Sequence, residues 1–214
     1  MDNEIKIPVL TAEQIRVLGA LMEKAKTTPD YYPMTMNGLV SACNQKTSRK
    51  PVVNYDEEVI GGALNSLKIA GLISTATGGS IRNIKYKHNF AIVYPLLPSE
   101  VAVMCLLFLR GPQTPGEINT NSGRLHEFET LEEVQQTLEK LANEGYIKQL
   151  PKRPGQKEQR YMHLFAGDVE FIEEDFSTDE PVKSNSQLEE RVAKLETELA
   201  ELKENFEKLM KELY

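Results

Sequence analysis

Basic side chains concentrate in three short segments, where their chemistry suggests contact with phosphate. Lysine and arginine neutralise phosphate groups, which gives a nucleic-acid affinity that falls with salt and carries little base-sequence information. Each residue alone is typical of a solvated surface, but the clustering favours contact with a duplex backbone. The candidate nucleic-acid-binding residues are Lys46, Arg49 and Lys50, then Arg82, Lys85 and Lys87, and finally Lys152, Arg153, Lys157 and Arg160.

Residues that could support catalysis or hold a metal form no recognisable pattern. The histidines are His88, His126 and His163. His126 stands beside Glu127, but sequence neighbours on an irregular segment rarely converge on a substrate. Cys43 and Cys105 lack metal-ligand spacing and are expected to be buried apolar residues. We therefore expect no catalysis, no cofactor and no metal, and no motif predicts an effector pocket.

The first basic segment lies within residues 35–73, which are expected to form a short helix, a polar connector and a longer helix. Asn54 and Glu57 form a capping-box pattern before the longer helix, which predicts its start. Gly71 supplies a left-handed stop after it. The first basic segment is therefore predicted to lie on an exposed connector between two helices.

The second and third basic segments fall on predicted hairpins. Residues 72–76 and 81–88 are β-prone and separated by a turn signal, and so are residues 146–150 and 159–165. A hairpin that follows a pair of helices is typical of the winged-helix arrangement. The basic side chains of these segments are therefore expected on the wings.

An internal repeat indicates that this arrangement occurs twice. Residues 97–109 match residues 10–22 without a gap, and residues 114–118 correspond to residues 35–39. Repeats of this kind predict two similar structural units in tandem. The expected fold is mainly α with small β-hairpin wings (α+β), in two tandem winged-helix domains. The expected domains are residues 1–95 and residues 96–168.

The end of the chain has a different character. Residues 169–185 are rich in acidic residues and serine, which predicts a flexible acidic linker. Residues 186–214 repeat apolar side chains at alternating steps of four and three, which predicts a coiled-coil helix and a homodimer. An amphipathic helix packed on its own domain is the alternative. The candidate oligomerisation residues are Leu188, Val192, Leu195, Leu199, Leu202, Phe206, Leu209 and Leu213.

The charge distribution permits nucleic-acid contact in spite of a net charge of −7. Basic residues outnumber acidic ones in residues 1–95, whereas the excess of acidic residues is greatest in residues 171–214. The acidic N-terminus lacks the apolar run of a signal peptide, and no apolar run is long enough to span a bilayer. We expect a cytoplasmic protein with no membrane association.

Three phrases of the chain resemble the YceH-like family of bacterial proteins of uncharacterised function. They are residues 42–49, 109–117 and 150–161. The likeness covers about residues 9–168 and implies a tandem winged-helix fold, but it implies no established activity. Lys50 stands where the family usually has an acidic residue, which strengthens the basic connector. Residues 118–122 lack the arginines that the family tends to have, which weakens the case for DNA contact by the second unit.

Two functional hypotheses follow. The first is a non-catalytic, dimeric, regulator-like protein that contacts double-stranded DNA through the connector and wings. Its third helices begin with acidic residues, at Glu57 and Glu132, which repel phosphate and disfavour ordinary major-groove reading. The second is a protein-interaction adaptor in which the winged-helix units are scaffolds for a protein partner. The sequence leaves both open.

Overall fold

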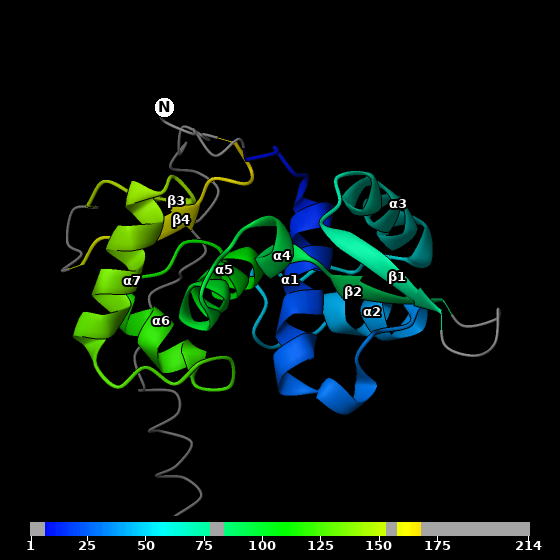
Figure 1. Cartoon of the computed structure of the whole chain (residues 1–214), viewed down its shortest axis with the longest axis horizontal. Coiled ribbons are helices and arrows are strands. Elements are labelled where there is room, and N and C mark those ends of the chain that lie inside the picture. The colour runs from blue at the N-terminus through cyan, green and yellow to red at the C-terminus, as the bar shows by residue number, and fades with distance from the viewer. Residues whose placement is uncertain (1–6, 78–83, 153–157, 168–214) are drawn as a thin grey trace, which may run out of the picture. The chain divides into compact units, whose positions relative to one another are not determined.

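Two groups of helices, each followed by a pair of short strands, succeed one another along the described chain (Figure 1). The structure is a computed structural model that describes residues 7–77, 84–152 and 158–167. The described elements are α1 (Ala12–Thr27), η1 (Pro29–Tyr31), α2 (Met36–Cys43), α3 (Glu57–Ile69), β1 (Ile73–Thr77), β2 (Ile84–His88), α4 (Phe90–Val93), α5 (Pro98–Arg110), α6 (Pro115–Ser122), α7 (Leu131–Asn143), β3 (Ile147–Gln149) and β4 (Tyr161–His163). The protein is thus mainly helical, with small antiparallel strand pairs.

The two repeats predicted from the sequence have the same order of elements. Helices α1, α2 and α3 precede the β1–β2 hairpin, and helices α5, α6 and α7 precede the β3–β4 hairpin. The registers also correspond, because Ile73 pairs with His88 and Ile147 pairs with His163. Each hairpin gains one further antiparallel bridge, formed by Met34 in the first repeat and by Gln113 in the second.

Local capping signals explain where several helices begin and end. The Thr11 hydroxyl accepts a hydrogen bond from the Gln14 amide, and the Gln14 side chain accepts one from the Thr11 amide, which completes a capping box for α1. Gly71, at φ 72°, provides the left-handed residue predicted after α3. The predicted capping box of Asn54 and Glu57 is wrong, because Asp56 caps α3 through a 2.9 Å bond from the Val59 amide.

Helices α1 and α5 pack against each other and join the two repeats. In Figure 1, α2, α3 and the first hairpin lie beside α1, and α6, α7 and the second hairpin lie on the α5 side. A Cβ atom at Gly19 would lie 3.0 Å from Phe108 Cβ, so glycine permits the close approach of α1 to α5. One hydrophobic core runs through both repeats, which form a single compact unit.

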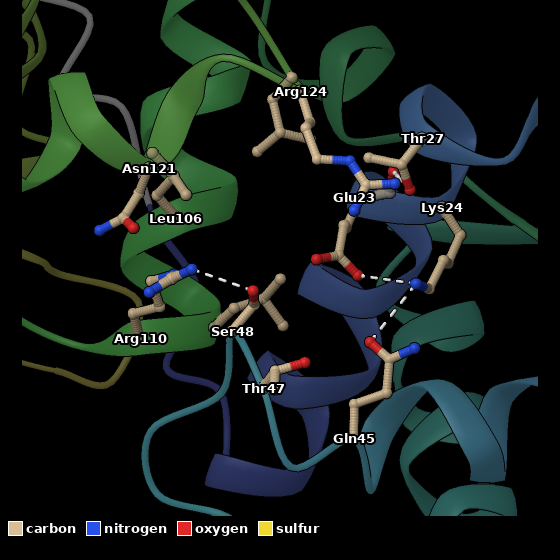
Figure 2. Close-up of a pocket in the computed structure, with 12 residues that line it drawn as sticks. Glu23, Lys24, Thr27, Gln45, Thr47, Ser48, Leu106, Arg110, Asn121 and Arg124 are labelled. Atoms are coloured by element: carbon tan, nitrogen blue, oxygen red, sulfur yellow. Dashed lines mark hydrogen bonds and ion pairs between the residues drawn. The ribbon is translucent and has the colours of Figure 1, made fainter. Parts of the chain in front are cut away.

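The connector between α2 and α3, residues 44–56, folds back on itself and reaches the second repeat. The Asn44 side chain donates to the Tyr55 carbonyl and accepts from the Tyr55 amide, each at 2.8 Å. The Lys50 amide donates to the Leu109 carbonyl at 2.8 Å. Arg110, at the end of α5, donates to the Ser48 hydroxyl at 2.9 Å (Figure 2). The connector is therefore part of the joint between repeats.

Candidate nucleic-acid interface

The three basic residues of the connector occupy different environments. Lys46 is exposed and Lys50 is half-buried, whereas the Arg49 side chain has 0% exposure. The expectation that Arg49 lies on an exposed basic surface is therefore wrong. Only Lys46 and Lys50 remain candidates for phosphate contact in this segment.

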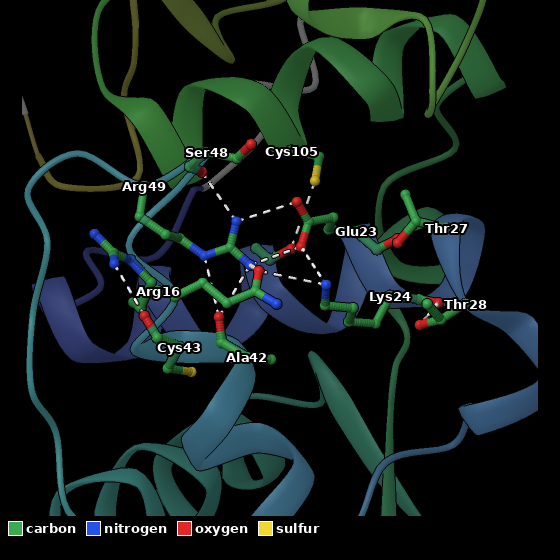
Figure 3. Close-up of polar contacts among 12 residues, drawn as sticks. Arg16, Glu23, Lys24, Thr27, Thr28, Ala42, Cys43, Ser48, Arg49 and Cys105 are labelled. Atoms are coloured by element: carbon green, nitrogen blue, oxygen red, sulfur yellow. Dashed lines mark hydrogen bonds and ion pairs between the residues drawn. The ribbon is translucent and has the colours of Figure 1, made fainter. Parts of the chain in front are cut away.

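Arg49 has a structural role that accounts for its burial (Figure 3). Its guanidinium donates to both carboxylate oxygens of Glu23 in α1, at 2.6 and 3.1 Å. It also donates to the Ala42 carbonyl at 3.0 and 3.1 Å, which satisfies the end of α2. Bidentate, charge-assisted hydrogen bonds of this kind are stronger than neutral ones. Arg49 thus ties the connector to α1 and α2.

Glu23 is the anionic centre of the same network. Burial raises the pKa of its carboxyl, but the hydrogen bonds and charges of Arg49 and Lys24 outweigh burial and lower the pKa overall. Lys24 contacts the Glu23 carboxylate at 3.2 Å and donates to the Gln45 side chain at 3.4 Å. The carboxylate is therefore ionised at neutral pH and already partnered.

A second buried arginine holds the connector and was not singled out in the sequence. Arg16 is 4% exposed and donates to the carbonyls of Cys43, at 3.1 Å, and Pro51, at 2.6 Å. A buried arginine must satisfy its donors within the protein. The sequence feature that could have indicated this burial is the position of Arg16 between the core residues Ile15 and Val17 on α1.

The first hairpin presents basic side chains on the side opposite the core. In β2, Lys85 and Lys87 alternate with Tyr86, which packs against the core, and with the largely buried His88. Lys87 is exposed, and Lys85 is partly exposed. The sequence has no Asp or Glu between Glu58 and Glu100, so the hairpin lysines have no carboxylate of their own segment to neutralise them.

The acidic residues of α3 are confined to its start. Glu57 and Glu58 are exposed in the first turn, where carboxylates suit the helix dipole. Further along α3, the exposed positions include Asn65, Lys68 and Ile69. The C-terminal two-thirds of the helix therefore carries no negative charge toward solvent.

The second hairpin uses its basic residues differently. Arg160, just before β4, donates to both oxygens of Glu117 in α6, at 2.8 and 2.9 Å, and to the Pro112 carbonyl at 2.9 Å. This bidentate pair neutralises Arg160 and braces the hairpin against α6. Lys152, which follows β3, is exposed. In the described part of this hairpin, Lys152 is the remaining candidate from the predicted set.

The other predicted site residues lie outside the described residues. This group includes the basic residues Arg82, Arg153 and Lys157 and all candidate oligomerisation residues of the tail: Leu188, Val192, Leu195, Leu199, Leu202, Phe206, Leu209 and Leu213. The acidic linker and the coiled coil therefore stay predictions.

The histidines and cysteines form no reactive centre in the described ranges. Burial lowers the pKa of both His88 and His163 to about 4, so both imidazoles are neutral at pH 7. Burial raises the pKa of the Cys43 thiol to about 11 and raises that of Cys105 as well. The prediction that both cysteines are buried is confirmed, with exposures of 0% and 1%. Metal-ligating side chains do not gather in groups of three within residues 7–77, 84–152 and 158–167.

None of the helices in the described part of the chain is both long and apolar enough to cross a bilayer.

Comparisons with known proteins agree with the resemblance in the sequence. A family model described as "Protein of unknown function, DUF480" matches residues 10–156. A "UPF0502 protein" of Solibacter usitatus is 49% identical over 198 residues, which cover 92% of this chain and 95% of the relative. The "UPF0502 protein YceH" of Salmonella typhimurium is 42% identical over 211 residues, which cover 95% and 97% of the two chains. The chain therefore belongs to the YceH-like DUF480 family of proteins of unknown function.

Proposed function

We propose that this protein is a non-catalytic tandem winged-helix protein that binds the backbone of double-stranded DNA through its first repeat. The observation that carries the proposal is the run without carboxylates from residue 59 to residue 99, which includes most of α3 and the first hairpin. Its described basic side chains are Lys68, Lys85 and Lys87. A positively charged surface attracts phosphate, and this segment contains no carboxylate that could compete with phosphate for its lysines.

The winged-helix assignment rests on how each repeat is built. Three helices precede a two-stranded hairpin, and an extra bridge at Met34 or Gln113 adds a third chain segment to each pair of strands. In DNA-binding proteins of this kind, the third helix faces the major groove and the hairpin lies along a phosphate strand. Helix α3 and the β1–β2 hairpin are the corresponding elements here.

The expected mode of binding relies on the wing more than on the start of the third helix. Glu57 and Glu58 repel phosphate at the start of α3, which keeps that end away from the backbone. Lys85 and Lys87 on the wing, with Lys46 in the connector, would track a phosphate strand. Contacts of this type give affinity that depends steeply on salt and little on base sequence.

A protein-interaction adaptor is the second candidate, favoured by exposed apolar side chains on the same elements. Ile69 in α3 is 88% exposed, and Ile84 in β2 is 50% exposed. Large exposed apolar residues can serve as anchors for a protein partner. A homodimer formed through residues 186–214 is compatible with either function and is part of the proposal.

The test is fluorescence anisotropy of the full-length protein with a labelled random-sequence duplex, measured over a series of salt concentrations. We expect micromolar binding at low salt that weakens steeply as salt rises. The double variant Lys85→Gln/Lys87→Gln should weaken binding and reduce the slope of log Kd against log salt by about 2. Lys152→Gln, which removes one exposed lysine of the second hairpin, is the control and should change little.

Two outcomes would contradict DNA binding by the first repeat. Absence of binding at low salt would reject the proposal outright. Equal losses in the Lys85→Gln/Lys87→Gln variant and the Lys152→Gln control would show that binding is not centred on the first hairpin. Loss of a co-purifying protein in an Ile69→Ser/Ile84→Ser variant, with duplex binding absent, would support the adaptor instead.

A further inference from the structure

A polar pocket of about 160 Å³ lies at the joint between the two repeats (Figure 2). Its walls come from the end of α1, the α2–α3 connector, the end of α5, and the segment from α6 to the α6–α7 connection. The charged side chains that line it are Glu23, Lys24, Arg110 and Arg124. Ligand sites are common at junctions between packed units of this type.

Positive charge predominates in the pocket. Lys24, Arg110 and Arg124 face a single carboxylate, that of Glu23. Glu23 already receives two hydrogen bonds from the buried Arg49 and a contact from Lys24. The Glu23 charge is therefore balanced from within the protein, and the charges of the two arginines remain available to an anion.

The two arginines retain hydrogen-bonding capacity. Arg110 donates to the Ser48 hydroxyl at 2.9 Å, and Arg124 has no hydrogen bond or ion pair to any residue that the structure describes. A guanidinium has five N–H donors in a planar fork, an arrangement that matches the oxygens of a phosphate group. In Figure 2 the two side chains reach the pocket from α5 and from the α6–α7 connection.

One residue that lines the same pocket, Ser48, has a strained backbone conformation. Ser48 has φ 59°, in the left-handed region that non-glycine residues rarely occupy. Its carbonyl accepts a hydrogen bond from Arg49, and its hydroxyl accepts one from Arg110. Strain of this type concentrates at binding sites, where surrounding contacts maintain it. Here those contacts place the Ser48 hydroxyl beside a pocket arginine.

We propose that the pocket binds a small ligand that carries a phosphate group, held chiefly by Arg110 and Arg124. Hydroxyl and amide groups of Ser48, Thr47 and Asn121 complete the polar lining. The volume suits a free phosphate or a small phosphate monoester, because pockets for larger ligands are about 300–1,000 Å³. This proposal is independent of DNA binding and assigns the junction a role as a ligand site.

The experiment measures the melting temperature of the full-length protein with increasing inorganic phosphate, at ionic strength kept constant with sodium chloride. We expect an increase that grows with the logarithm of phosphate concentration and reaches about 3–5 °C when phosphate reaches ten times its Kd. Arg124→Gln should abolish the increase. This variant should fold normally, because Arg124 is exposed. Lys152→Gln, an exposed substitution after β3 and outside the pocket, should leave the increase intact.

Further measurements separate the possible sources of the phosphate. A tighter Kd for ribose 5-phosphate than for inorganic phosphate would support an organic phosphate ligand, and equal values would support the free anion. The proposal is overturned if phosphate acts no differently from chloride or if Arg124→Gln retains the full shift. It is also overturned if Arg124→Gln weakens duplex binding as much as Lys85→Gln/Lys87→Gln, because the arginine would then belong to a DNA surface.

Discussion

The two repeats share a backbone design but pair their charges differently. Both hairpins place a histidine opposite an isoleucine, at His88 and His163, and both gain the same extra bridge. In the second repeat, Arg160 is bound to Glu117 in α6. In the first repeat, the lysines of β2 lie in a stretch of the chain that has no carboxylate.

The fold constrains the core of each repeat but not the charges on its surface. Buried positions have to fill the same space in both repeats, so apolar residues and histidine recur there. A charged surface residue contributes little to stability, so one hairpin can be neutralised while the other stays basic. This asymmetry is why the proposed DNA contact is assigned to the first repeat alone.

The largest expected effect is acid destabilisation through the feature that both repeats share. His88 and His163 have a pKa of about 4 in the folded protein, below the ordinary value of 6.5. Between pH 6.5 and 4 the unfolded chain therefore binds more protons, and stability falls as pH is lowered. The expected loss is roughly 3 kcal/mol for each histidine at pH 4. Urea unfolding at several pH values measures it.

A matched pair of variants shows whether the two histidines are equivalent. His88→Gln and His163→Gln should each remove about half of the slope of unfolding free energy against pH in this range. In both histidines, Nδ1 is buried without a hydrogen-bond partner in the described structure. A proton added at Nδ1 would therefore form no hydrogen bond to offset the cost of the buried charge. An unchanged slope in either variant would contradict the shared role.

The next effect concerns the arginine that distinguishes the first repeat. Arg49→Ala should destabilise the protein by about 3–5 kcal/mol, because it leaves the largely buried Glu23 carboxylate without its bidentate partner. Chemical denaturation measures the loss. Lys46→Ala, an exposed change in the same connector, should alter stability by less than about 0.5 kcal/mol. Similar small effects from both variants would mean that Arg49 does not hold the connector.

The smallest effect concerns the ion pair that distinguishes the second repeat. A double-mutant cycle of Arg160→Gln and Glu117→Gln should give a coupling energy of about 0.5–1 kcal/mol, because the pair is bidentate but partly exposed. Glutamine at position 117 can still accept the hydrogen bond from the Thr114 amide, so the start of α6 is preserved. A coupling energy near zero would show that the pair is incidental to the hairpin.

Local signals predicted most of the helices and strands. The left-handed glycine predicted after α3 is present, because this signal depends on residues within one turn. The capping box at Thr11 is a local signal of the same kind. Thr130 caps α7 by accepting from the Glu133 amide, and the Glu133 side chain accepts from the Glu129 amide. The predicted strands overlap the observed ones in both hairpins.

The errors arose where a distant residue decides the local structure. Asn54 and Asp56 can both cap a helix, but Asn44 holds Tyr55 in the connector, so the helix begins after it and Asp56 is the cap. In the sequence, nothing distinguishes Arg49 from the neighbouring lysines Lys46 and Lys50. Its burial depends on Glu23, 26 positions earlier in the chain.

The pocket was not predicted for the same reason. Arg110 and Arg124 belong to the second repeat, and Ser48 belongs to the connector of the first. Nothing in their sequence spacing relates them, because the packing of α1 against α5 brings them together.

Periodicity, caps and the internal repeat follow from interactions within a few residues, so the chain's own pattern was sufficient to predict the order of helices and hairpins. The close approach of the two repeats at Gly19 and the burial of Arg16 and Arg49 depend on residues far apart in the chain. Burial and ion pairing are properties of three-dimensional neighbours, so only the tertiary structure decided which charged groups hold the fold together and which remain available to a ligand.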